Sequence, residues 1–263
     1  MCSYQARLSR IDVARMIRWS DLVVEVLDAR DPLATRNTWI EDVAHSLDKQ
    51  LILAINKADL VPLEVLKLWK KYFKGMGLEA VFLSAKERLG TRKLIVAIRE
   101  RAPKLPVRVA VVGYPNVGKS TIINYLKERS AASTSPVPGW TKVSQIYRAK
   151  EWLIVADTPG VLTRDTNDYA LMVVRGFINP DGVDDPVKPA LEFMKRAMSI
   201  MPNIFKDAYG ISEQDPLRIL EELAKVRGRL MKGGLPNIQE AARIIIRDWN
   251  SGKLTYYYKP PEG

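Results

Sequence analysis

Residues 113 to 120 read Gly113-Tyr114-Pro115-Asn116-Val117-Gly118-Lys119-Ser120, and they directly follow the apolar run Val107–Val112. Two glycines separated by four residues, followed by Lys and Ser, are typical of a phosphate-binding loop between a strand and a helix. The glycines let the backbone curl around a phosphate, Lys119 reaches the terminal oxygens, and the Ser120 hydroxyl is placed to bind Mg²⁺. The residues expected to contact nucleotide here are Asn116, Val117, Gly118, Lys119, Ser120 and Thr121.

The rest of the first part of the chain predicts a doubly wound α/β sheet. Continuous apolar runs are typical of parallel strands that are covered on both faces, and helix-period segments lie between them. The expected strands are Leu22–Leu27, Leu51–Ile55, Ala80–Leu83, Val107–Val112 and Leu153–Ala156, and the expected helices are Thr38–Leu47, Leu63–Phe73, Thr91–Arg101 and Lys119–Arg129. Val143–Arg148 and Trp152–Ala156 predict an antiparallel edge hairpin that turns at residues 149–151. Glu25 interrupts the first strand, and we expect a partner for it across the sheet.

The character of the sequence changes after residue 177. Turn residues at Asn179–Gly182 are followed by three helical segments, at Pro189–Met201, Pro216–Met231 and Asn237–Asn250. Asn237 is a candidate N-cap and Gly252 a C-terminal stop. We therefore expect a first domain at 1–177, which begins with a basic helix at 5–19, and a small all-helical domain at 178–263.

Composition limits the classes of protein to which this chain can belong. The 263 residues carry a net charge of +11, and residues 1–177 hold 28 Lys and Arg against 18 Asp and Glu. This surplus favours a polyanionic partner, with nucleic acid the first candidate. A single cysteine, Cys2, and a single histidine, His45, exclude a disulfide and a Cys/His zinc site, so we expect a reducing cytoplasm. The sequence contains no apolar run of membrane-spanning length, and we expect a monomer without membrane contact.

The purine base is indicated by two further motifs at strand ends. Asn56-Lys57-Ala58-Asp59 follows the second strand, where the Asp59 carboxylate can accept from guanine N1–H and N2–H. Asn56 can bond N7, and the Lys57 stem can lie along the base. In Ser84-Ala85-Lys86, after the next strand, the Ala85 N–H is expected to meet guanine O6. Adenine offers no matching donor pair, which disfavours an ATPase.

The metal and the γ-phosphate are served by the motif Asp157-Thr158-Pro159-Gly160, after the last strand. Asp157 is expected to hold Mg²⁺ through water, and the Gly160 N–H to meet the γ-phosphate. Thr141 is expected to close over Mg²⁺ when that phosphate is present. All these motifs lie at carboxyl ends of strands, where an open α/β sheet places its ligand.

The order of the motifs is unusual, because the guanine motifs precede the phosphate motifs. In this order the chain resembles the circularly permuted GTPases of ribosome assembly, the group that contains RbgA (YlqF) and the nucleostemin-like proteins. The resemblance extends over nearly the whole chain and includes three further segments, Asp28-Ala29-Arg30-Asp31-Pro32, Lys232–Asn237 and Asp248–Lys253. It implies a P-loop, Ras-like GTPase fold, circularly permuted, with slow hydrolysis of GTP to GDP and action on the large ribosomal subunit.

The resemblance also assigns provisional catalytic roles, to Lys119, Thr141, Gly160 and Asn116. Asn116 matches an asparagine that helps to bind K⁺ in similar GTPases. Val161 occupies the position of the Ras glutamine that orients the attacking water, and its aliphatic side chain cannot do so. The N-terminal histidine of RbgA-like proteins has no equivalent here, so rRNA is a candidate source of the missing catalytic group.

Two functions therefore remain open from the sequence. The first is a GTPase that assembles the large ribosomal subunit through rRNA binding. The second is a GTP-dependent switch that binds a protein partner without RNA contact. Salt dependence separates them, because binding to rRNA weakens linearly in log K against log salt.

Overall fold

A computed structural model of the chain describes residues 2–128, 145–158 and 168–262. The chain forms two compact units, one of residues 1–164 with 259–263 and one of residues 165–258. Helix α7 (Tyr169–Val174), which the expected division at residue 177 assigns to the first domain, belongs to the second unit.

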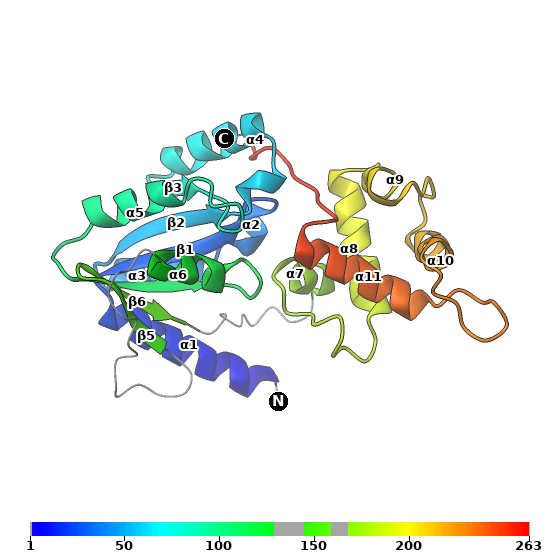
Figure 1. The fold of residues 1–263 in the computed structure, drawn as a ribbon, viewed down its shortest axis with the longest axis horizontal. Helices are drawn as coiled ribbons and strands as arrows, with labels where there is room; N and C mark the ends of the chain where they lie inside the picture. The colour runs from blue at the N-terminus through cyan, green and yellow to red at the C-terminus, as the bar shows by residue number, and fades with distance from the viewer. Residues whose placement is uncertain (1, 129–144, 159–167, 263) are drawn as a thin grey trace. The chain divides into compact units, whose positions relative to one another are not determined.

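The first unit is built on a six-stranded sheet with the order β3-β2-β1-β4-β6-β5 (Figure 1). All neighbouring strands are parallel except β5 and β6, which form the expected antiparallel edge hairpin. The strands are β1 (Leu22–Asp28), β2 (Gln50–Asn56), β3 (Glu79–Phe82), β4 (Val107–Gly113), β5 (Gln145–Lys150) and β6 (Leu153–Asp157). The predicted mostly parallel α/β sheet is therefore confirmed. The expected turn at residues 149–151 is shorter, because β5 continues through a bulge to Lys150.

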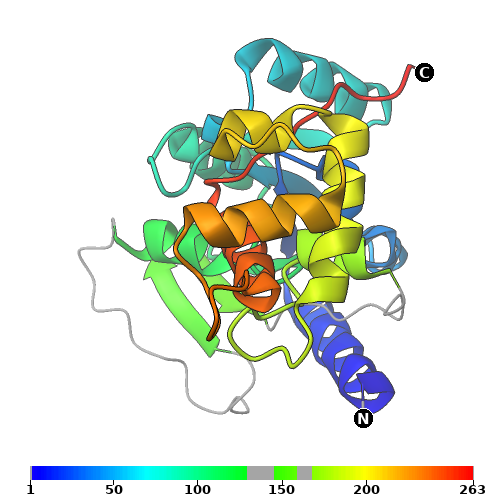
Figure 2. The same cartoon turned by 90° about the vertical axis from the view of Figure 1, so that its right-hand side faces the viewer.

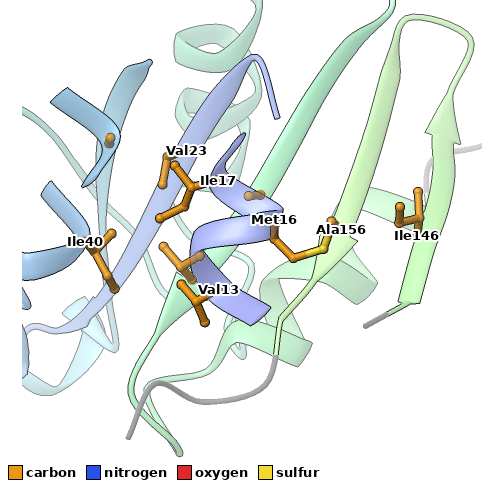
Figure 3. Close-up of a cluster of buried hydrophobic side chains, with 10 residues drawn as sticks. Val13, Met16, Ile17, Val23, Ile40, Ile146 and Ala156 are labelled. Carbon is orange, nitrogen blue, oxygen red and sulfur yellow. The ribbon is translucent and has the colours of Figure 1, made fainter. Parts of the chain in front are cut away.

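Helices cover the sheet on both faces. On one face, α1 (Cys2–Trp19) and α3 (Thr38–Ser46) pack on strands β1, β4 and β6 and on the edge strand β5. Figure 3 shows Val13, Met16 and Ile17 of α1 above the side chains of these strands. The other helices are α4 (Leu63–Gly75), α5 (Thr91–Glu100) and α6 (Lys119–Glu128), and α5 and α6 contact each other and the sheet. Uniformly apolar strands follow directly from this two-sided burial.

Two short elements at strand ends escaped the sequence reading. Asp31 caps α2 (Pro32–Thr35) by accepting from the Ala34 N–H at 3.2 Å. The 3₁₀-helix η1 (Ala58–Leu60) begins after Lys57, which has a left-handed backbone with φ 61°. Both elements follow strands at the edge of the sheet where the nucleotide motifs lie, and neither is long enough to show a helical period.

Glu25 has its partner at a helix start rather than across the sheet as expected. Its side chain is fully buried in the middle of β1, and Oε1 accepts from the Asn37 N–H, which precedes α3, at 2.7 Å. Oε2 has no hydrogen-bond partner among the described residues. Burial raises the pKa of Glu25 well above its ordinary value, which favours the neutral form of this carboxyl in the folded chain.

The second unit is all-helical, as expected. It consists of α7, α8 (Val187–Ile200), α9 (Ile204–Tyr209), α10 (Pro216–Val226) and α11 (Ile238–Ser251) (Figure 2). The Asn237 side chain caps α11, and Gly252 ends it in a left-handed conformation, as predicted. Helix α10 ends at Val226 rather than at Met231, because Gly228 takes a positive φ and the following residues form a β-bridge, Leu230 with Pro236. Trp249 stacks on Tyr256 in the core of this unit, with ring centroids 4.8 Å apart.

Candidate functional site

The predicted motifs meet at one edge of the sheet. The strand register places Asp28 opposite Asn56, Val26 opposite Gly113, and Val111 opposite Asp157. The carboxyl ends of β1, β2, β4 and β6 therefore lie side by side, although the motifs that follow them are far apart in sequence. An open α/β sheet places its ligand at such an edge.

The Asn56 side chain ties three of the motifs together. Its Nδ2 donates to the carbonyl of Val117 in the phosphate loop at 2.8 Å, and its Oδ1 accepts from the Ala85 N–H at 2.9 Å. Asn56 is buried, so both bonds are shielded from water. The Ala85 N–H, expected at guanine O6, thus has a protein acceptor in this structure. The amide of Asn56 retains a second N–H, and its bond to guanine N7 stays a prediction.

The phosphate loop has the backbone that its glycines predict. Gly113 and Gly118 take φ values of 142° and 99°, and Asn116 is left-handed at 56°. A Cβ at Gly118 would collide with Asn56 Nδ2, and one at Gly113 would lie 2.5 Å from the Val26 carbonyl oxygen. The glycines therefore serve close approach as well as conformation.

Lys119 begins α6 and folds back over the loop. Its ammonium group donates to the carbonyls of Gly113 at 3.1 Å and Tyr114 at 2.7 Å. Burial lowers the pKa of Lys119 to about 8, although the charge of Asp157 opposes this shift. Among the described residues, the hydrogen bonds of this buried cation go to carbonyl oxygens, so the oxygens of a phosphate would complete its charge balance.

Two of the three predicted magnesium ligands, Ser120 and Asp157, lie near this lysine. Ser120 is exposed in the first turn of α6, and Asp157 ends β6. Burial raises the pKa of Asp157, while the charges of Lys119 and Lys127 lower it. A hydroxyl and a carboxylate are hard oxygen donors of the kind that Mg²⁺ prefers when phosphate oxygens and water fill its other positions. Thr158, a residue of the same motif to which the sequence assigned no role, donates from Oγ1 to the Val111 carbonyl at 2.8 Å and anchors the Asp157 motif to β4.

The guanine motifs occupy the neighbouring strand ends. Asp59 is exposed in η1, where its carboxylate is accessible to a base. Ser84 is buried, and its hydroxyl accepts from the Glu87 N–H at 3.2 Å, which shapes the loop after β3. The Lys86 side chain is exposed. The ammonium of Lys57, whose stem we expected along the base, is bound to Asp28 at 2.8 Å.

Three predicted positions lie outside the described residues. These are Thr141, expected over Mg²⁺, Gly160, expected at the γ-phosphate, and Val161, at the Ras glutamine position. The other two provisional catalytic residues, Lys119 and Asn116, are described, and Asn116 is exposed in the phosphate loop.

Within the ranges that the structure describes, no group of three His, Cys, Asp or Glu side chains forms a metal site made of protein alone. Among the same residues, no helix combines the length and the apolar character that crossing a bilayer requires.

Several known proteins are similar to this chain in sequence and in fold. Residues 108–198 match the family described as 50S ribosome-binding GTPase. An uncharacterised GTP-binding protein of Methanocaldococcus jannaschii is 39% identical over 93% of this chain and 65% of its own length. A guanine nucleotide-binding protein-like 3 homolog of Caenorhabditis elegans is 32% identical over 95% of this chain and 50% of its own. Nuclear/nucleolar GTPase 2 of Oryza sativa is also 32% identical, over 95% and 48% respectively. The chain thus spans about half to two thirds of the length of these relatives.

Solved structures agree with the sequence relatives. YlqF from T. maritima, crystallised with GNP, superposes with a TM-score of 0.66 at 26% identity and covers 96% of this chain and 98% of its own. A GDP-bound structure of the same YlqF gives 0.67. The match runs over almost the full length of both chains, and the circularly permuted order of elements in this chain is consistent with that of YlqF.

Proposed function

We propose, since the chain belongs to the circularly permuted GTPases related to YlqF and to the nucleolar GTP-binding proteins, that it binds GTP and GDP with Mg²⁺ and hydrolyses GTP to GDP and phosphate. The observation that carries this proposal is the Asn56 side chain, which joins the base-recognition motif to both the phosphate loop and the Ser84-Ala85-Lys86 loop. One buried amide thereby fixes the position of the proposed base-recognition loops relative to the phosphate loop.

Nucleotide selectivity tests the binding part of the proposal. We expect GDP to bind in the presence of Mg²⁺ at least about a hundredfold more tightly than ADP, because a carboxylate at Asp59 pairs with guanine donors that adenine lacks. The Asp59→Asn variant is expected to lose this preference. Equal affinity of the parent chain for GDP and ADP would end the proposal.

Hydrolysis is proposed to rest on positioning and charge rather than on a glutamine. Lys119 is expected at the β- and γ-phosphates, Ser120 and Asp157 at Mg²⁺, and Thr141 and Gly160 at the γ-phosphate. Asn116, exposed in the loop with φ 56°, is proposed to help hold a K⁺ there. Release of phosphate from GTP in K⁺ and in Na⁺ buffers is the measurement, and equal rates would remove the K⁺ role alone.

We propose that the polyanionic partner is rRNA of the large ribosomal subunit. Helix α1 buries Val13, Met16 and Ile17 against the sheet and leaves Arg15 and Arg18 exposed on its outer face. Arginines on a helix that is already anchored by its apolar face suit contact with phosphates. The ribosomal connection of similar proteins, in the family described as 50S ribosome-binding GTPase, supports the choice.

Sedimentation with purified ribosomal subunits, with a GTP analogue or GDP, tests this partner. The Arg15→Ala/Arg18→Ala double variant is expected to reduce the slope of log K against log salt by about 1 to 2, since each lost phosphate contact removes close to one released ion. A salt-independent interaction would favour the alternative, a switch that binds a protein partner. The division into a nucleotide-binding domain and a helical domain, the monomeric state and a cytoplasmic location are proposed with this function.

A further inference from the structure

A buried carboxylate, that of Asp28, contacts the base-recognition motif Asn56–Asp59. Asp28 ends β1, and its side chain is 2% exposed. Its Oδ1 accepts from the backbone N–H and the Nε of Arg30, each at 3.0 Å, and its Oδ2 accepts from Arg30 Nη2 at 2.7 Å. The Arg30 side chain is itself 1% exposed. The guanidinium is thus held by both carboxylate oxygens in a planar, two-pronged pair.

The same carboxylate also holds Lys57. Lys57 Nζ lies 2.8 Å from Asp28 Oδ2, and its residue has the left-handed backbone that turns the chain from β2 into η1. The main chains are joined as well, because Asp28 lies opposite Asn56 in the parallel register and the Ala29 N–H donates to the Asn56 carbonyl at 2.8 Å. The end of β1 therefore fixes both the backbone and the lysine of the motif that reads the base.

The charges make this arrangement interdependent. Burial by itself would raise the pKa of Asp28, but the charges of Arg30 and Lys57 outweigh it and hold the pKa below its ordinary value. Burial lowers the pKa of Lys57, and Asp28 is the strongest influence against that shift. Without the carboxylate, Arg30 and Lys57 would both lose the charge that they share in a buried place, and Lys57 would shift its position or lose its proton more readily.

We propose that Asp28, with Arg30 clamped to it, is a positioning residue for guanine recognition, because it fixes the Lys57 side chain, whose stem is expected along the base. This inference rests on the proposed binding of guanine nucleotides. Asp28 and Arg30 would then act on the nucleotide through Lys57 and Asn56. Loss of the contacts of Asp28 with Arg30 and Lys57 should weaken binding of the guanine base and leave binding of the phosphates unchanged.

The chain supplies a matched control at the other end of the same strand. Asp21 directly precedes β1 and also lies between an arginine and a lysine. It accepts from Arg108 Nε at 2.9 Å and Nη2 at 2.7 Å, and Lys104 Nζ lies 3.4 Å from it. The chemistry is the same, but the opposite end of the sheet carries no nucleotide motif.

The experiment compares Asp28→Asn with Asp21→Asn in the full chain. Affinities for GDP, ADP and inorganic tripolyphosphate are measured together with the melting temperature. For Asp28→Asn we expect GDP affinity to fall at least about tenfold, as when one partner of a buried charge pair is removed, with tripolyphosphate affinity within about twofold of the parent. Asp21→Asn is expected to change the melting temperature but neither affinity. A merely structural role for Asp28 predicts equal losses for GDP and tripolyphosphate, and that result would overturn the inference.

A second variant covers the case in which Asp28→Asn fails to fold. Lys57→Met keeps the Asp28–Arg30 pair and an unbranched stem but removes the anchored ammonium. We expect it to lose GDP affinity at least about tenfold and to keep tripolyphosphate affinity within about twofold of the parent. Where Asp28→Asn folds, the double variant should lose no more GDP affinity than either single variant. Parent-like GDP affinity in Lys57→Met, or fully additive losses, would overturn the inference. A parent chain that does not prefer GDP to ADP would instead overturn the proposed function, and the inference with it.

Discussion

The two ends of strand β1 carry the same trio of charges in different settings. At the amino end Asp21 pairs with Arg108 and Lys104, whose side chains are 34% and 61% exposed. At the carboxyl end Asp28 pairs with Arg30 and Lys57, which are 1% and 19% exposed. Both carboxylates have pKa values below the ordinary one, that of Asp21 at about 2, because their cations outweigh the effect of burial.

The difference between the ends shows that location decides what an ion pair contributes. The Asp21 trio ties β1 to β4 at the solvent boundary, where water screens the charges and the contribution to stability is small. The Asp28 trio lies among the loops that follow the strands, where sequence-distant motifs converge. Buried charges at that end hold a loop in one conformation. A loop that is already in its binding conformation favours ligand binding even where the ion pairs add little to the free energy of unfolding.

The largest effect is expected from cutting the link between the loops at the carboxyl end. Asn56→Ala leaves the Val117 carbonyl and the Ala85 N–H unpaired in a buried place, at about 1–3 kcal/mol for each. GDP affinity should fall about a hundredfold or more, as measured by titration. The control is Asn237→Ala, which removes the cap of α11 and should cost about 1 kcal/mol of stability without changing GDP affinity. Equal effects of the two variants on GDP would refute the special role of this edge.

A somewhat smaller loss is expected from a single methyl group in the phosphate loop. In Gly118→Ala the new Cβ meets Asn56 Nδ2 at a positive φ, so both the loop and its link to Asn56 must shift. We expect GDP affinity to fall about tenfold to fiftyfold, in keeping with about 1–2 kcal/mol of backbone strain plus a weakened hydrogen bond. Gly210→Ala carries a similar positive φ with open space around it, and it isolates the strain. That variant should lower the melting temperature and leave GDP binding as it is.

A pH profile tests the charge at the same edge. Lys119 has a pKa of about 8 without nucleotide, and phosphate oxygens should raise it on binding. GDP affinity should therefore be level below pH 8 and fall by roughly tenfold per pH unit above it, because binding then requires uptake of a proton. The Lys119→Arg variant, which stays protonated, should show a flat profile from pH 7.5 to 9. If both proteins lose affinity in parallel, Lys119 is not the titrating group.

The smallest effect is expected in the middle of β1, on stability alone. Burial raises the pKa of Glu25 in the folded chain, so the unfolded chain, with the ordinary pKa of 4.5, gives up this proton at a lower pH than the folded chain does. Stability from this group is therefore present at acidic pH and is lost as pH rises towards the raised pKa, by about 1.4 kcal/mol per unit. Glu25→Gln should be more stable than the parent at pH 7.5 by at least about 1 kcal/mol, and this gain should vanish near pH 4.

Chemical denaturation at the two pH values measures the difference. Glu79→Gln, on the half-exposed pair with Arg101, is the control and should change stability by less than about 1 kcal/mol at both. A destabilised Glu25→Gln at pH 7.5 would mean that Glu25 is ionised in the fold and has found a cation.

The sheet and the phosphate loop could be predicted because their signals are local. Two-sided burial makes strands such as Val107–Gly113 uniformly apolar, and the loop after it needs glycines at fixed places. The cap at Asn237 and the stop at Gly252 are local as well. The end of α10 was wrong by several residues because Leu230 and Met231 continue an apolar pattern although the chain has already turned at Gly228.

The links between motifs could not be predicted, because they depend on strand register. Asp28 meets Lys57 only since β1 and β2 pair with Asp28 opposite Asn56. Asp28 belongs to a segment that the family resemblance marks, but no pattern in the sequence predicts its contact with Lys57. Thr158 and its bond to β4 were missed for the same reason. Elements as short as η1 show no helical period in the sequence. The hydrogen bond from the Asn37 N–H to Glu25 joins a strand to the start of a helix, and the apolar pattern of the strand does not predict it.

The chain enters the helical unit after residue 164 and returns to the sheet unit at residue 259. The helical unit is therefore inserted into the chain of the sheet unit, and both of its ends are covalently continuous with that unit. A truncation at residue 164 would remove residues 259–263 of the sheet unit together with the helical unit, so the two units cannot be separated by a single cut without loss to the first.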